Sequence, residues 1–257
     1  MLLAIDSGNT NVHFAIYDGE TRRGEWRTSS NPERTADEYA VWLDQLMRLD
    51  HLGRDDVDAA IIANVVPAAS FNLRSLCRRY FKCEPLVVAD DGVGLGIEVR
   101  VERPDEVGAD RLVNTVGAGL SYDTPLIVID FGTATTFDVV DDGGNYVGGV
   151  ICPGIALSLD ALHAAAAKLP LVAVKKPPQV IGTGTVTAMQ SGVYWGYVGM
   201  IEGLVSRIEA EHGAAMTVIA TGGLAPLFHD ATQVIGHLDP DLTMRGLLEI
   251  YRRNKPS

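Results

Sequence analysis

The fold of this chain is decided by the stretch Leu3-Ala4-Ile5-Asp6-Ser7-Gly8-Asn9-Thr10, which occurs again in similar form as Ile127-Val128-Ile129-Asp130-Phe131-Gly132-Thr133-Ala134. The separation between Asp6 and Asp130 is 124 positions, and Gly8 and Gly132 are separated by the same number. Each copy predicts an apolar strand, a tight D-x-G turn and a second strand. One such turn needs no role beyond bending the chain. Two copies, each opening one half of the chain, indicate duplicated hairpins whose backbone amides are available to phosphate oxygens.

The rest of each half alternates between helical and strand patterns. Apolar residues at helical spacing predict helices over 36–49, 71–81, 109–119, 156–167 and 190–211. Apolar runs predict buried strands over 57–66, 85–89 and 216–220. The chain is therefore expected to be an α/β protein with two similar domains, residues 1–120 and 121–257.

Composition narrows the class of protein. The 257 residues are 47% hydrophobic, so the chain is long and apolar enough to bury a core. Its net charge of -12 argues against nonspecific binding to nucleic acid or to an anionic membrane. The three cysteines, Cys77, Cys83 and Cys152, fit neither a zinc knuckle nor a disulfide scaffold. Asp6 interrupts the apolar start, and no apolar run reaches the roughly 20 residues of a membrane span. We expect a soluble cytoplasmic protein.

Four motifs follow one another along the chain and together identify a family. They are Asp6-x-Gly8-Asn9-Thr10, Gly108-Ala109-Asp110-Arg111, Asp130-x-Gly132-Thr133-Ala134-x-Thr136-x-Asp138 and Gly148-Gly149-x-Ile151-x-Pro153-Gly154. In order and spacing this set resembles the type III pantothenate kinases. The resemblance implies duplicated ribonuclease-H-like domains with an ATP cleft between them, as in acetate and sugar kinases, heat-shock ATPases and actin. It also implies ATP-dependent phosphorylation of pantothenate to 4'-phosphopantothenate, the first step of coenzyme A biosynthesis.

The resemblance implies an ATP site on the first hairpin, and the chain lacks the G-x-x-x-x-G-K-[ST] loop that would offer another. The implied ATP-binding residues are Asp6, Ser7, Gly8, Asn9, Thr10, Asn11, Val12 and His13, with Thr133 from the second hairpin. Asp6 suits Mg²⁺, which keeps several waters and uses one or two carboxylates. We expect His13 to contribute backbone, because the sequence shows no partner acid for its imidazole. Asp130 is implied to bind a monovalent cation, K⁺ or NH₄⁺.

By the same resemblance Asp110 is the general base, and the residues implied to bind pantothenate are Gly108, Ala109, Asp110, Arg111 and Thr185. In isolation, Glu106, Asp110 and Arg111 would fit charged residues at a helix N-terminus, where acids are favoured. Next to Arg111, the Asp110 carboxylate is expected to stay ionised. Thr185 also suits a helix N-cap. The chain departs from the family pattern at Gly184, often Asn, and at Val101, often Tyr, so its substrate contacts are open to change.

Several questions stay open from the sequence. Gly222-Gly223 fits either an adenosine-binding turn or a simple turn between strand and helix. Rival functions are a phosphatase or sugar kinase of the same superfamily and a nonenzymatic ATP-binding regulatory homologue. Family members are dimers. Four glycines on one helical face, Gly192, Gly196, Gly199 and Gly203, indicate close packing, either against a second subunit or within the chain.

Overall fold

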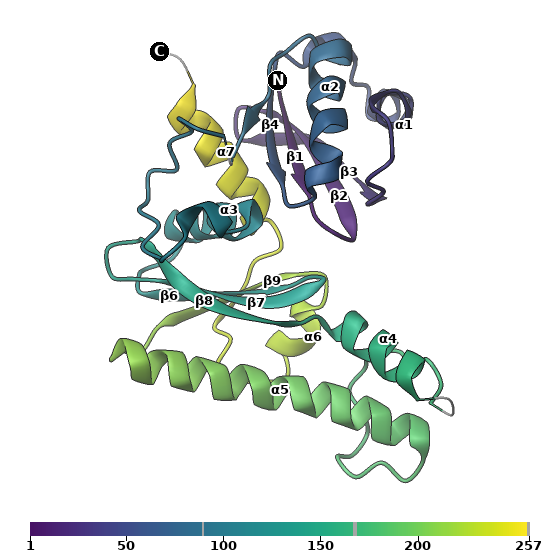
Figure 1. Ribbon diagram of the computed structural model, residues 1–257, viewed down its shortest axis with the longest axis vertical. Helices are drawn as coiled ribbons and strands as arrows, with labels where there is room; N and C mark the ends of the chain where they lie inside the picture. The colour runs from purple at the N-terminus through teal and green to yellow at the C-terminus, as the bar shows by residue number, and fades with distance from the viewer. Residues whose placement is uncertain (89, 167–168, 256–257) are drawn as a thin grey trace. The chain divides into compact units, whose positions relative to one another are not determined.

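The computed structural model describes residues 1–88, 90–166 and 169–255 (Figure 1). These residues form two compact units. Unit 1 contains residues 1–120 together with the segment that starts at Asp241, and unit 2 contains residues 121–240. Ala89 and Ala167, each the last residue of a predicted element, lie outside the described residues.

Unit 1 is built on a five-stranded sheet in the order β3-β2-β1-β4-β5. The antiparallel strands are β1 (Leu2–Ser7), β2 (Asn11–Asp18) and β3 (Thr21–Ser29). The strands β4 (Ala59–Asn64) and β5 (Leu86–Val87) continue the sheet in parallel with β1. The helices are α1 (Ala36–Leu49), α2 (Ser70–Tyr80), α3 (Ala109–Gly119) and α7 (Leu242–Asn254), with short 3₁₀ turns at Arg54–Asp56, Pro67–Ala69 and Pro104–Glu106.

Alternation along β1 explains why this sheet is covered on both faces. Leu3 and Ile5 belong to the cluster that includes residues of α1 and α2. Leu2 and Ala4 point to the other face and belong to the cluster that includes residues of α3 and α7. Successive side chains of a strand point to opposite faces, so an uninterrupted apolar run is what a strand buried on both faces requires.

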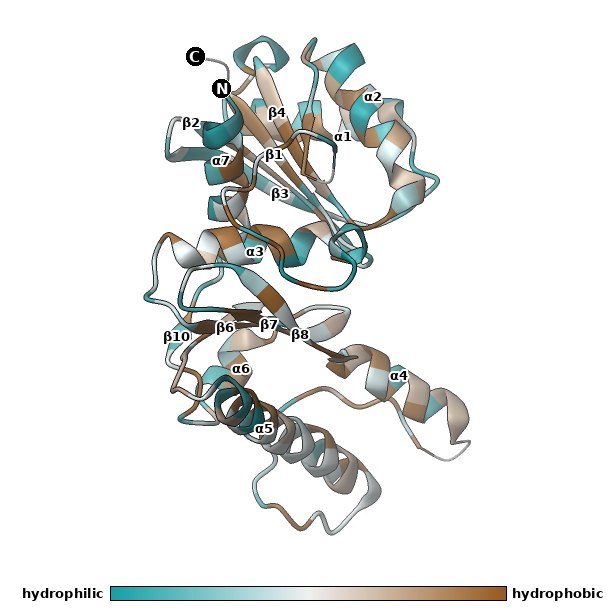
Figure 2. Ribbon diagram, turned by 60° about the vertical axis from the view of Figure 1, so that its left-hand side comes forward, coloured by the Kyte–Doolittle hydropathy of each residue, from teal (hydrophilic) through white to brown (hydrophobic). Residues whose placement is uncertain are grey.

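Unit 2 repeats the same strand order. Its sheet runs β10-β9-β6-β7-β8, which is the order of unit 1 read from the other edge. The strands are β6 (Leu126–Phe131), β7 (Ala134–Val140), β8 (Tyr146–Pro153), β9 (Thr217–Gly222) and β10 (His237–Leu238), and the helices are α4 (Ile155–Ala165), α5 (Thr185–His212) and α6 (Ala225–His229). Figure 2 shows the central strands β6 and β7 in the brown of hydrophobic residues. The α/β prediction is confirmed, and the common strand order agrees with duplication.

The last helix differs from the sequence-based division of the chain. Residues from Asp241 onward were expected in the second domain, but α7 packs in unit 1. Its buried Met244, Leu247 and Ile250 join the cluster that contains Leu2 and Val113. The helix is required there because it covers a face of the first sheet that α1 and α2 leave open.

The long helix α5 carries the glycine stripe in an unexpected setting. Among the described residues, and apart from the helix's own backbone, a Cβ atom placed at Gly192, Gly196 or Gly199 would meet no atom within 4 Å, and one at Gly203 would meet only the Arg207 guanidinium, at 3.1 Å. Close packing within the chain is therefore wrong as an explanation for the first three glycines. Among the described residues, no helix combines the length and the apolar character that crossing a membrane requires.

Candidate active site

The turn between β1 and β2 has an exposed tip, and hydrogen bonds fix its base. The Gly8 amide donates to the Asn11 carbonyl at 3.0 Å. Behind the turn, the Ser30 amide donates to the Thr10 carbonyl at 2.8 Å, and the Ser30 hydroxyl donates to the Gly8 carbonyl. Asn9, Thr10 and Asn11 are exposed. The tip therefore offers amide and hydroxyl donors from a backbone that is already ordered.

Three of the predicted ATP-binding residues do not present side chains at this tip. Ser7 and Val12 are each only 1% exposed, so their side chains belong to the interior. Within the described part of the chain, the Ser7 hydroxyl has no hydrogen-bond partner. The His13 Nε2 atom lies 2.8 Å from the Glu25 Oε1 atom. The expectation that His13 lacks a partner acid is therefore wrong. Burial, followed by the charge of Arg27, lowers the pKa of its imidazole.

The turn between β6 and β7 resembles the first but is one residue shorter. Asp6 faces His13 across the first hairpin, whereas Asp130 faces Thr136 across the second. The Gly132 amide donates to the Ala134 carbonyl at 3.0 Å and leaves Thr133 exposed at the tip. The Gly154 amide donates to the Thr133 carbonyl at 3.0 Å, and a Cβ at Gly154 would lie only 2.1 Å from that oxygen. Only glycine fits this position.

Asp130 lies at the end of β6, where the backbone of β9 comes unusually close. Gly222 has a φ of +91°, and a Cβ there would lie 2.7 Å from the Asp130 Oδ1 atom. The next residue, Gly223, opens onto space in which a Cβ would meet nothing within 4 Å. Asp130 and Asp6 are each partly buried carboxylates beside a turn. Carboxylate oxygens of this kind are the hard donors that Mg²⁺ and similar cations prefer.

Asp110 lies in the first turn of α3, and its side chain folds back over the helix start. Its Oδ1 atom accepts a hydrogen bond from the Arg111 amide at 2.8 Å. A Cβ at Gly108, the N-cap, would lie 2.6 Å from the same oxygen, so glycine makes this placement possible. Burial raises the pKa of the Asp110 carboxyl and outweighs the opposing effects of the Arg111 amide and guanidinium. Arg111 favours the ionised carboxylate, as expected, but burial has the larger and opposite effect.

The first turn and the Asp110 helix converge on one residue of unit 1. The Val65 amide donates to the Ser7 carbonyl at 3.0 Å. The Val65 Cγ1 atom would also lie 3.7 Å from a Cβ at Gly108. Asn64 fixes this corner through two hydrogen bonds to the Val66 backbone, at 2.9 and 3.0 Å. Sequence reasoning missed Val65, because the predicted strand over 57–66 includes it, whereas β4 ends at Asn64.

The remaining predicted site residues belong to unit 2 or accompany Asp110. Arg111 is partly buried next to Asp110, and Ala109 is buried. Thr185 is the exposed first residue of α5 in unit 2, as Asp130 and Thr133 are residues of unit 2. The N-cap of α5 is Gly184, whose amide donates to the Thr187 hydroxyl at 3.1 Å, so the N-cap interpretation of Thr185 is wrong.

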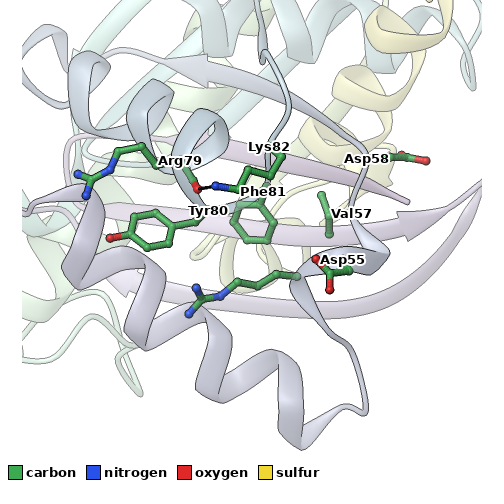
Figure 3. A pocket seen from close by; sticks show the side chains of 8 residues that line it. Asp55, Val57, Asp58, Arg79, Tyr80, Phe81 and Lys82 are labelled. Atoms are coloured by element: carbon green, nitrogen blue, oxygen red, sulfur yellow. Dashed lines mark hydrogen bonds between the residues drawn. The ribbon is translucent and has the colours of Figure 1, made fainter.

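A separate pocket of about 660 Å³ contains none of the predicted site residues (Figure 3). It is lined by Arg54, Asp55, Val57, Asp58, Arg79, Tyr80, Phe81 and Lys82. The Asp58 amide donates to the Met1 carbonyl at 3.0 Å, so the pocket lies near the start of β1 and the Gly8 turn lies past its end. Arg54 already pairs with Asp44 at 2.7 Å and Arg79 with Asp37 at 3.0 Å. Its arginines are therefore engaged by the protein itself.

The two similar α/β units define a fold class that solved structures share. The structure of an inorganic polyphosphate/ATP-glucomannokinase from Arthrobacter sp. strain KM shares this fold, with a TM-score of 0.50 and 16% sequence identity over 98% of this chain and 99% of that chain. Within that class, residues 2–207 match the family profile described as type III pantothenate kinase. The chain belongs to the type III pantothenate kinase family.

Full-length relatives agree with this assignment. The type III pantothenate kinase of Paramagnetospirillum magneticum (strain AMB-1) is 69% identical over 254 residues, which cover 99% of this chain and 98% of the relative. The type III pantothenate kinase of Rhodospirillum rubrum is 65% identical over 256 residues, which cover both chains completely. The resemblance inferred from the ordered motifs is confirmed.

Proposed function

We propose that this chain transfers the γ-phosphate of ATP to the primary hydroxyl of pantothenate in the cytoplasm, the first step of coenzyme A biosynthesis. Membership of the type III pantothenate kinase family supports the reaction. The observation that carries the assignment of residues is the convergence of the Gly8 turn and the Asp110 helix on Val65. A phosphate-binding turn and a base must be close neighbours, because phosphoryl transfer depends on positioning and charge neutralisation.

In this proposal the first hairpin binds the ATP phosphates. Gly8 permits close approach of the backbone, and the exposed tip residues Asn9, Thr10 and Asn11 donate hydrogen bonds. Ser7, Val12 and His13 contribute through the backbone, because their side chains are buried or engaged. Thr133 binds the phosphates from the second hairpin. Asp6 would hold Mg²⁺, which neutralises phosphate charge when bound.

Asp110 acts as the general base on the acceptor. Its carboxylate takes the proton of the pantothenate hydroxyl as the new P–O bond forms. A pKa raised by burial makes this carboxylate a stronger base than an exposed aspartate. Arg111 binds the carboxylate or amide region of pantothenate through its planar set of donors. Gly108, Ala109 and Thr185 complete the acceptor site.

Asp130 would hold the monovalent cation, K⁺ or NH₄⁺. The cation supplies positive charge near the phosphates in a protein with a net charge of -12. Gly222 lets the β9 backbone lie close to this carboxylate, since a Cβ there would lie 2.7 Å from the Asp130 Oδ1 atom.

A homodimer is the assembly that we propose. The open glycine stripe of α5 supports it, since three glycines have no close neighbour within the described chain. Exposed apolar side chains of unit 2 support it as well, among them Leu157, Val180 and Ile181, which are 51%, 62% and 80% exposed. Solvent-exposed apolar surface of this kind is typical of contacts between subunits.

Release of ADP in a coupled assay tests the reaction. We expect rapid ADP release with pantothenate and background rates with acetate and a panel of sugars. Phosphorylation of a sugar instead would favour the sugar-kinase alternative. ATP binding without ADP release from any acceptor would favour a nonenzymatic regulatory homologue.

A further inference from the structure

A glycine-rich loop of unit 1 is fastened to the C-terminal turn of α7. The Gly94 amide donates to the Asn254 Oδ1 atom at 2.7 Å, and the Asn254 Nδ2 atom donates to the Gly94 carbonyl at 2.8 Å. One side-chain amide thus pairs with both backbone groups of Gly94, as a neighbouring strand would. The Asn254 amide is itself fixed, because it also donates to the Ile250 carbonyl at 2.7 Å.

Arg253 makes a second attachment one residue further along this loop. Its Nη1 atom donates to the Leu95 carbonyl. Its Nε atom donates to the Glu249 carboxylate at 2.7 Å, and Glu249 is only 8% exposed. Gly96 adopts a φ of +71°, and a Cβ there would lie 2.3 Å from the Arg253 guanidinium. The loop and the arginine therefore fit each other only with glycine at this position.

The same helix also contacts α3, the helix that follows the segment after the loop. Residues 98–107 lead from the loop to Gly108, where α3 begins. The helices α3 and α7 touch backbone to backbone, since a Cβ at Gly246 would lie 2.1 Å from the Val113 carbonyl oxygen. The Thr243 hydroxyl donates to Asn114 at 2.7 Å across the same contact. Helix α7 thus contacts the chain before residues 98–107, at Gly94 and Leu95, and after them, at Val113 and Asn114 of α3.

We infer that Arg253 and Asn254 are positioning residues for the acceptor site, acting through the loop at residues 94–96 on the segment that ends at Asp110 and Arg111. The inference rests on the proposed function, in which those two residues bind and activate pantothenate. Neither Arg253 nor Asn254 touches the substrate in this account. Loosening the loop displaces the acceptor-binding residues and leaves the Gly8 turn, which Ser30 and Val65 hold, in place.

Two neighbouring arginines give a matched test. Arg252 and Arg253 both pair with Glu249 at 2.7 Å, but Arg252 is 74% exposed in its side chain and is paired with Glu249 rather than with the loop. We expect Arg253→Ala and Asn254→Ala each to raise the KM for pantothenate about threefold to tenfold, the effect of losing about one net hydrogen bond. The KM for ATP should change less than twofold. Arg252→Ala should behave like the wild type in both.

Hydrogen exchange of the loop provides a readout that does not depend on turnover. Amides of residues 94–107 should exchange faster in Arg253→Ala and Asn254→Ala than in the wild type or Arg252→Ala. Asn254→Asp keeps the acceptor for the Gly94 amide but places a carboxylate oxygen against the Gly94 carbonyl, so it should resemble Asn254→Ala.

The two hypotheses fail in different ways. An active wild type whose Arg253→Ala and Asn254→Ala variants keep the KM for pantothenate would overturn the positioning role alone. Equal increases in the KM for pantothenate and for ATP would also overturn it, because they would indicate general loosening of unit 1. A wild type that releases no ADP with pantothenate would overturn the proposed function and the inference with it.

Discussion

Asp110 is the residue that we propose as the general base. It is partly buried at a helix start, and burial raises its pKa. We expect Asp110→Asn to lower kcat by about 10²- to 10⁴-fold, the usual cost of removing a general base. ATP affinity should be retained. Asp105→Asn, which changes an exposed carboxylate of the same segment, is the control, and ADP release is the measurement. Wild-type turnover in Asp110→Asn would remove the assigned role.

Asp110→Asn is expected to lower turnover but not to lower the stability of the fold. The folded protein binds the Asp110 proton more tightly than the unfolded chain does, because the pKa is raised on folding. The free energy of unfolding therefore falls as pH rises through the interval between the ordinary and the raised pKa, and ionised Asp110 destabilises the fold above that interval. Asparagine avoids this cost and can still accept from the Arg111 amide. Urea unfolding at neutral pH should show Asp110→Asn to be at least as stable as the wild type.

Asp130 is the residue whose role the cation response decides. If Asp130 binds K⁺, then Asp130→Ala should raise the KM for ATP and abolish stimulation by K⁺, because the carboxylate and the ion act together. A potassium titration in buffer free of sodium and ammonium measures both effects. Asp123→Ala, which removes an exposed carboxylate of unit 2, should keep the wild-type response. Equal stimulation of wild type and Asp130→Ala would exclude Asp130 from the cation site.

Individual residues also show which features of the site could be predicted from the sequence and which could not. The D-x-G turns could be predicted because the alternation of apolar and turn residues is local. The partner of His13 could not, since Glu25 reaches it diagonally from β3 and the pairing depends on strand register. The direction of the Asp110 pKa shift could not be predicted either. The shift depends mainly on burial by parts of the chain that are distant in sequence, whereas the opposing charge of Arg111 can be inferred because Arg111 is the next residue.

At the scale of elements, the contact between α3 and α7 makes the sharpest prediction. Alanine is normally preferred to glycine within a helix by about 0.8 to 1 kcal/mol. At Gly246 the new Cβ would lie 2.1 Å from a backbone oxygen, which no side-chain movement relieves. We expect Gly246→Ala to lower the free energy of unfolding by about 1 to 3 kcal/mol, the range of overpacked cores.

Gly119 provides the matched control for this contact. It is the last residue of α3, and a Cβ there would meet nothing within 4 Å. Gly119→Ala should therefore be neutral or slightly stabilising in the same urea titration. If both variants had the same midpoint, the two helices would not be in the close contact that the structure describes.

Elements with a strong internal pattern were predicted well. The helices predicted over residues 36–49 and 109–119 have those bounds as α1 and α3, because apolar spacing defines both locally and the Thr35 capping box marks the start of α1. Helix α5 begins at Thr185, five residues before the predicted start. Its N-cap is Gly184, so no capping side chain marks this helix start in the sequence. The contribution of α7 to unit 1 was missed, since an amphipathic helix shows which of its faces is buried and not which sheet covers it.

The whole molecule is expected to be a homodimer that uses the glycine stripe of α5. Light scattering at micromolar concentration should give twice the mass of the 27.5 kDa chain. Gly199→Leu should shift the protein toward the monomer, because the subunit itself has space for the side chain and a partner packed on the stripe does not. Gln45→Leu, at an exposed position of α1, should remain dimeric. A monomeric wild type would refute the dimer, and a dimeric Gly199→Leu would exclude the stripe from the interface.

The return of α7 to unit 1 has a consequence for the order in which the protein acquires its structure during translation. Unit 2 is one continuous stretch, residues 121–240, and is synthesised in full before α7 exists. Unit 1 has nearly all of its sheet by then but still lacks Met244, Leu247 and Ile250, which close one face of its core. Domains of a nascent chain fold as units once they are complete. The core of unit 1 is therefore the last to close, although β1 is the first strand to leave the ribosome.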